Sequence, residues 1–128
     1  MFGLFKKPDS KKSTNECLEV WGMLTDRDKQ SSAQNILKYA RGLSQKCSTP
    51  SEAITTIGQL KQGVIKQYGL RDHIHPAHMQ LQILSDYIFS RQQSLPDHVY
   101  ARFALDKLTA TLDRNEQAEL IQLLDKFI

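Results

Sequence analysis

The stretch that decides the fold runs from His75 to Ser90 and reads His-Pro-Ala-His-Met-Gln-Leu-Gln-Ile-Leu-Ser-Asp-Tyr-Ile-Phe-Ser. Pro76 stands at a first helical position, where its missing N–H costs nothing, and His75 or Asp72 precedes it as a cap. Apolar side chains then recur every three or four residues, at Ala77, Leu81, Leu84 and Ile88, with Ile83 and Tyr87 widening the stripe. A helix this apolar on most sides is expected to be buried by several neighbours.

Helical periodicity continues on both sides of this stretch, and no strand-like alternation is present. Helix-start signals separate the segments, at Ser13-x-x-Glu16, Thr25-x-x-Asp28, Thr49-Pro50-x-Glu52, Ser94-x-x-Asp97 and Asp113-x-x-Glu116. Gly69 is a natural helix end. The sequence therefore predicts an all-α, compact bundle of about six helices, over residues 13–25, 29–47, 50–68, 76–92, 96–112 and 114–127. The short loops favour antiparallel neighbours.

Length and composition indicate one domain. A chain of 128 residues, 40% of them hydrophobic, can bury a single core, which we place in residues 13–128. Residues 1–12 carry four lysines against one aspartate and are expected to form a basic, disordered tail. No apolar run approaches the roughly 20 residues of a spanning helix, and the order of charges differs from a signal peptide. A cytoplasmic location is therefore expected.

The first residues of the tail leave two alternatives open. Apolar side chains precede two lysines, an order that would allow weak contact with a membrane surface through Phe2, Leu4, Phe5, Lys6 and Lys7. In the other alternative, the phenylalanines fold back onto the core.

No catalytic or cofactor signature is present. Cys17 and Cys47 lack CxxC spacing and are expected to be two reduced thiols. No spacing selects a cysteine–histidine pair, and no glycine-rich phosphate loop occurs. We therefore expect a protein that is not an enzyme and has no cofactor.

The histidines near the central helix are candidates for a metal site. Asp72, His73, His75 and His78 are residue types that bind zinc. Their spacing matches no zinc motif, and Pro76 fixes the backbone between two of them. The alternative is that they are connector and capping residues.

Charge is separated along the chain. Residues 29–71 carry a net charge of +6, whereas residues 13–28 and 72–128 each carry −3. Five basic side chains of the second and third helices are the candidates for a binding surface, namely Lys38, Arg41, Lys46, Lys61 and Lys66. They predict a surface for another protein with acidic groups or for nucleic acid, and the alternative is an ordinary solvated face.

Three apolar features of the sequence lead to further expectations. Trp21 is expected in the core. The fifth helix carries a seam at Ala101, Leu105, Leu108 and Leu112, with Phe103 and Ala104 widening it. The last helix is more apolar than one stripe requires, so Leu120, Leu124 and Phe127 either bind a partner, including a second copy, or close the core.

These observations favour a small cytoplasmic protein-interaction module that is not catalytic, such as an adaptor, a chaperone-like protein or an inhibitor. One alternative is a nucleic-acid-binding regulator that uses the basic second and third helices. The other is a histidine-dependent metalloprotein.

Overall fold

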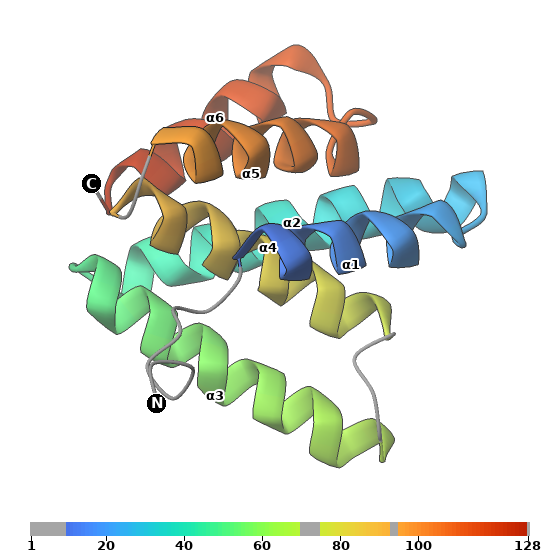
Figure 1. Ribbon diagram of the computed structural model, residues 1–128, viewed down its shortest axis with the longest axis horizontal. Helices are drawn as coiled ribbons and strands as arrows, with labels where there is room; N and C mark the ends of the chain where they lie inside the picture. Colours follow the sequence, from blue (N-terminus) through green and yellow to red (C-terminus); the bar gives the residue numbers. More distant parts are fainter. Residues whose placement is uncertain (1–9, 70–74, 93–94, 128) are drawn as a thin grey trace, which may run out of the picture.

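Six helices make up the part of the chain that the computed structural model describes, which is residues 10–69, 75–92 and 95–127. They are α1 (Ser10–Gly22), α2 (Asp26–Lys46), α3 (Pro50–Tyr68), α4 (Pro76–Arg91), α5 (Leu95–Leu108) and α6 (Arg114–Asp125) (Figure 1). These residues contain no strand, and none of their helices is long and apolar enough to cross a bilayer. The prediction of an all-α fold of about six helices is confirmed.

The starts of α3 and α6 are reciprocal capping boxes, as predicted. The side chains of Thr49 and Asp113 accept hydrogen bonds from the backbone N–H of Glu52 and Glu116, whose carboxylates accept from the cap residues in return. The pKa of Glu52 is lowered by hydrogen bonds from the backbone N–H groups of Ser48 and Thr49. Both starts therefore follow from local chemistry within four residues.

The segment around α4 is also bounded as predicted. The Nδ1 atom of His75 accepts a hydrogen bond from the backbone N–H of Ala77 at 3.0 Å, so His75 caps α4. Gly69 ends α3 with a φ of 62°, a left-handed conformation that glycine adopts without steric cost. Thr25 caps α2 by accepting from the N–H of Asp28, although α2 begins at Asp26 and not at residue 29.

The predicted start of α1 is wrong. The helix begins at Ser10, so Ser13 lies inside it and does not cap it. The Ser13 hydroxyl donates to Asp86 Oδ2 at 2.6 Å, and the hydroxyl of Thr14 donates to the same oxygen at 3.0 Å. A long-range bond to α4 therefore takes the place of the expected capping box.

The predicted end of α5 is also wrong. The helix stops at Leu108, and a turn follows in which the N–H of Leu112 donates to the carbonyl of Thr109 at 3.0 Å. The Thr109 hydroxyl donates to the carbonyl of Leu105 at 2.7 Å, so the buried threonine finds its partner in the last helical turn. Leu112 is nevertheless buried, as a seam residue should be.

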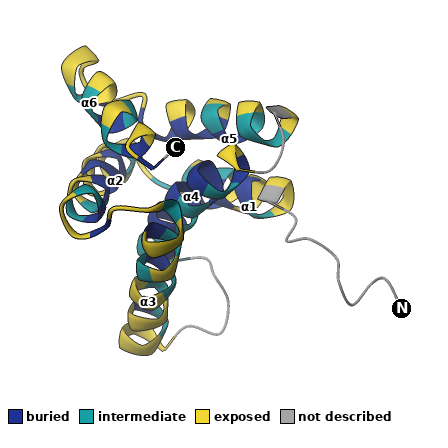
Figure 2. Ribbon diagram, turned by 90° about the vertical axis from the view of Figure 1, so that its left-hand side faces the viewer, coloured by how far each residue is buried: buried dark blue, intermediate teal, exposed yellow. Residues whose placement is uncertain are grey.

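The helix α4 is the centre of the fold. It packs against α1, α2, α3 and α5, and Figure 2 shows it as the most completely buried helix. Its side chains with almost no solvent exposure are Met79, Leu81, Ile83, Leu84 and Tyr87. Helices that follow each other in the chain do not always pack on each other. The helix α1 packs mainly on α4 and α5, and α2 packs mainly on α4 and α6. Burial of α4 on most sides agrees with the apolar stripe in its sequence.

Trp21 does not enter the core fully. It is partly buried and packs against the core from the side. The Lys29 ammonium lies 4.2 Å from the centre of its ring, and that of Lys107 lies 5.7 Å away. The indole thus stays at the surface between two cations, which its negative ring face attracts.

Candidate partner-binding site

The outward side of α5 exposes two large apolar side chains. Val99 and Phe103 are 59% and 58% exposed, and they are four residues apart on one face of the helix. The opposite face carries buried Ala101 and Leu105, which point to the core. Figure 2 shows α5 with its exposed side turned away from α4.

Phe103 was expected to widen the buried seam, and this expectation is wrong. It lies two residues from both Ala101 and Leu105, and a step of two residues turns a helix by about 200°. The spacing therefore places Phe103 opposite the seam. Together with Val99 it forms the outer face of α5, the name used below for these two residues.

A groove of about 600 Å³ lies beside this face, between α5 and α6. Arg102 and Asp106 line it from α5, where they form an ion pair at 3.1 Å. Arg114, on the α6 side, forms no ion pair with any described residue. The remaining residues that line the groove are Gln117, Ala118 and Ile121. The groove thus combines an apolar wall with two arginines and a single aspartate.

A polar cluster around the buried Tyr87 joins α4, α5 and α6. The Tyr87 hydroxyl donates to Asp125 Oδ1 at 3.3 Å, and the His98 ring packs against the Tyr87 ring with centroids 4.9 Å apart. Arg91 lies 3.1 Å from His98 Nε2 and 3.9 Å from Asp125.

These contacts set the charge states of the cluster. Burial and the nearby arginines lower the pKa of His98, and burial raises the pKa of Tyr87. Both rings are therefore neutral near pH 7 and serve to position the helices around the groove.

The five predicted basic residues differ in their contacts. Arg41 donates to both carboxylate oxygens of Glu119 on α6, at 2.7 and 2.8 Å. Lys61 donates to Gln82 Oε1 at 2.7 Å, on the side of α4 that meets α1. Lys38, Lys46 and Lys66 are exposed and form no ion pair with a described residue. Two members of the set thus have side-chain partners within the fold, and the three lysines keep the role of a partner-binding surface as a prediction.

The apolar residues predicted on the last helix lie in the core. Leu120, Leu124 and Phe127 are at most 2% exposed. The α6 helix packs on α2, and the Lys126 ammonium donates to the backbone carbonyl of Ser44. The alternative that these residues close the core therefore holds within the described structure, and a partner cannot contact them unless α6 moves.

The histidines are also separated. His75 caps α4, whereas His78 is buried and lines a small cavity on another side of the helix. Asp72 and His73 lie outside the described residues, as do Phe2, Leu4, Phe5, Lys6 and Lys7. The described residues contain no group of three side chains that could hold a metal ion.

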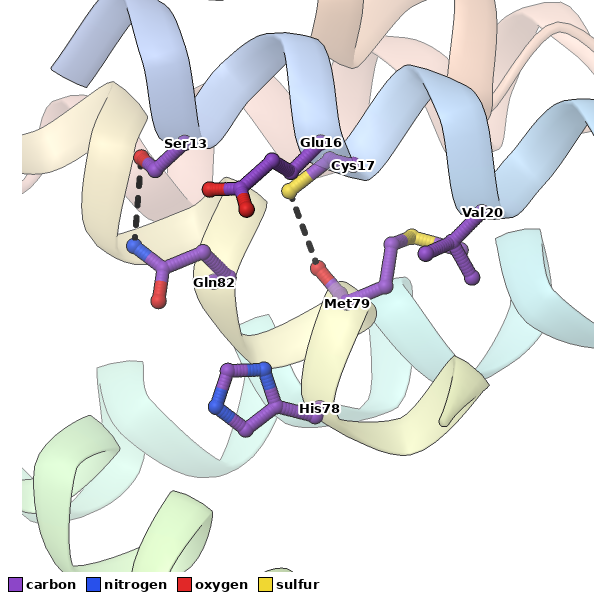
Figure 3. A pocket seen from close by; sticks show the side chains of 7 residues that line it. All are labelled: Ser13, Glu16, Cys17, Val20, His78, Met79 and Gln82. Carbon is purple, nitrogen blue, oxygen red and sulfur yellow. Dashed lines mark hydrogen bonds between the residues drawn. The ribbon is translucent and has the colours of Figure 1, made fainter. Parts of the chain in front are cut away.

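The cavity beside His78 lies between α1 and α4 (Figure 3) and has a volume of about 40 Å³. The thiol of Cys17 donates to the carbonyl of Met79 at 3.7 Å, and burial raises its pKa well above that of a free thiol. Gln82 Nε2 lies 3.5 Å from the Ser13 hydroxyl across the same space. A cavity of this size has room for only a few water molecules, and a protonated thiol is a poor nucleophile.

Comparison with protein-family models, with curated proteins and with solved structures gives no match to this chain. The outer face of α5 and the adjoining groove are therefore interpreted from their own geometry.

Proposed function

We propose that this chain is a non-catalytic protein-interaction module that binds an amphipathic, acidic segment of another protein. The partner lies along the outer face of α5 and in the α5–α6 groove. The observation that carries the proposal is the pair of exposed apolar side chains, Val99 and Phe103, beside a groove with an unpaired arginine.

The apolar part of the interaction rests on burial. Covering a large apolar side chain contributes about 1.5–3 kcal/mol, and aromatic residues are enriched among the side chains that dominate binding energy. Phe103 is already held on a helix whose inner side is packed in the core. Binding a partner therefore requires little ordering of the backbone that carries Phe103.

The polar part of the interaction determines which sign of charge the partner should carry. In the groove, Asp106 offsets Arg102, and Arg114 remains as an exposed cation. Lys107 continues the positive charge on the other side of Phe103, where it lies over Trp21. An acidic partner gains from these charges, and a basic one is repelled.

Selection of displayed peptides against the immobilised full chain tests the proposal. We expect enriched peptides that combine aromatic or leucine side chains at helical spacing with acidic residues. Phe103→Ser should weaken binding of these peptides about thirtyfold, the equivalent of about 2 kcal/mol. Arg114→Glu should weaken the acidic peptides further, because it reverses the charge in the groove.

Leu60→Ser is the matched control, because Leu60 is 40% exposed on α3, away from the groove. It should leave binding unchanged. Peptides that bind the Phe103→Ser and wild-type chains equally, or that carry no acidic residues, would contradict the proposal. A partner that proves to be a second copy of the chain, detected as a dimer that Phe103→Ser dissociates, would contradict it as well.

A further inference from the structure

A second cleft lies on the other side of the fold, where α2, the end of α3 and the start of α4 meet. Its volume is about 430 Å³, within the range of small-molecule sites. Asn35, Lys38 and Tyr39 line it from α2, Tyr68 from α3, and His75 and Gln80 from α4. In Figure 1, α3 lies below α4, whereas α5 and α6 lie above it.

Gln80 is the unusual residue of this cleft. It is only 3% exposed, no hydrogen bond joins its side chain to another described residue, and its amide is not among the wholly enclosed unpaired groups, which are Ser32 Oγ and His98 Nδ1. The little surface that the residue exposes therefore lies at the cleft, where its amide can bind water or a ligand. The Gln80 amide lines the cleft and offers one acceptor and two donors to whatever enters it.

Flat rings form much of the remaining wall. The rings of Tyr68 and His75 are stacked, with centroids 4.1 Å apart and an angle of 21° between their planes. Tyr68 is 51% exposed, so its ring remains accessible to a ligand. Burial, and then the neighbouring Tyr68, raise the pKa of Tyr39, which is therefore neutral. Such a wall suits a planar, aromatic ligand.

Charge selects among such ligands. Lys38 is the one lysine or arginine among the lining residues, and none of them is an aspartate or glutamate. An anionic ligand is therefore favoured over a cationic one. This sign also argues against a basic peptide as the occupant.

We infer that the cleft binds an unpaired adenine base together with its phosphate. The Gln80 amide pairs with the donor and acceptor that adenine presents side by side, as glutamine does when it reads adenine in DNA. The base stacks on the tyrosine wall, an interaction worth about 1–3 kcal/mol per base, and the phosphate lies at Lys38. The base comes either from a free adenosine monophosphate or from single-stranded nucleic acid.

Calorimetric titration of the full chain with AMP, GMP, adenosine and an oligoadenylate of eight nucleotides tests this inference. AMP should bind at least about tenfold more tightly than GMP, because the wrong base leaves the Gln80 amide mispaired. Adenosine should bind more weakly than AMP, and the AMP affinity should fall with added salt. A much tighter oligoadenylate identifies single-stranded nucleic acid as the source, whereas equal affinities identify the free nucleotide.

Two variants and a control complete the test. Gln80→Leu removes the amide from a buried site without opening a cavity, and it should weaken AMP binding at least about tenfold while the fold is kept. Tyr68→Leu removes an exposed ring and should weaken AMP and GMP alike. Phe103→Ser should leave AMP binding unchanged. A failure of the nucleotide inference can therefore be distinguished from a failure of the proposal that a partner binds the outer face of α5. Absence of binding by AMP and by oligoadenylate, or equal binding in Gln80→Leu, would overturn the inference, as would an acidic peptide that binds in the cleft.

Discussion

The buried carboxylate of Asp86 is the main polar link between α1 and α4. It is 4% exposed and accepts hydrogen bonds from Ser13 at 2.6 Å and Thr14 at 3.0 Å, both on α1, and from Gln82 at 2.8 Å. Burial raises the pKa of Asp86, although the hydrogen bonds from Ser13, Gln82 and Thr14 oppose this effect. The carboxylate therefore joins two helices at the cost of being buried.

Asp86→Ala removes all three acceptor contacts. Thr14, which is 1% exposed, is then left with a buried hydroxyl that has lost its partner. This unpaired group and the two other lost bonds, offset by relief of the carboxylate burial, predict a net destabilisation of about 2–4 kcal/mol. For a domain of this size the melting temperature should fall by about 10 °C. Asp86→Asn keeps one acceptor oxygen and carries no charge, so it should cost much less.

The pH dependence distinguishes the two variants further. Because the pKa of Asp86 is raised in the folded state, the protonated carboxyl stabilises the fold below the unfolded-state pKa of about 3.9. This contribution is lost as the pH rises through the higher folded-state pKa. Asp86→Asn cannot ionise. Its stability relative to wild type should therefore improve between about pH 4 and about pH 7.

Denaturant unfolding followed by the fluorescence of Trp21, the single tryptophan, measures both effects. The free energy of unfolding is compared for wild type, Asp86→Asn and Asp86→Ala at both pH values. If Asp86→Asn is as unstable as Asp86→Ala near neutral pH, the negative charge itself holds α1 in place and the reasoning is wrong.

Three further predictions concern single positions. Gly69→Ala should lower the melting temperature, because a residue with a side chain pays about 1–2 kcal/mol for the φ of 62° at this position. Gly58→Ala should instead raise the free energy of unfolding by about 0.5–1 kcal/mol, because there is open space around the added methyl group. Tyr87→Phe should cost about 0.5–1.5 kcal/mol in denaturant unfolding, because it removes the hydroxyl that bonds to Asp125 and interacts with Arg102, and a loss above this range would show that the hydroxyl does more than make these two contacts. Cys17 should resist a thiol reagent in the native chain and react fully after unfolding, because the thiol is buried and its pKa is raised; rapid native reaction would show that α1 opens.

Much of the fold could be predicted from the sequence because its signals are local. The capping box of Thr49 and Glu52, the proline after Thr49 and the left-handed Gly69 bound α3 within a few residues of chain. The central position of α4 could be predicted because a helix that is apolar on most sides has to be buried. The start of α1 could not, because the hydroxyl of Ser13 bonds to Asp86, 73 residues away in the sequence.

The candidate site was much less accessible to sequence reasoning. The exposure of Phe103 could have been predicted from helical spacing, because Phe103 lies opposite the seam of Ala101 and Leu105. The groove was not, because Arg102 and Arg114 come together only through the placement of α5 and α6. The ion pair of Arg41 could not be predicted for the same reason, since its partner Glu119 is 78 residues away.

The central claim, that a partner binds the outer face of α5, is tested most directly by site-specific photo-crosslinking. A photoreactive phenylalanine derivative replaces Phe103 in the full chain inside its native cells, and the same derivative replaces Leu60 on α3 as a control, because both side chains are exposed. We expect the derivative at Phe103 to crosslink to one protein, within an acidic amphipathic segment, and the derivative at Leu60 not to crosslink to it. No crosslink at Phe103, the same products at both positions, or crosslinks only to a second copy of this chain would contradict the central claim.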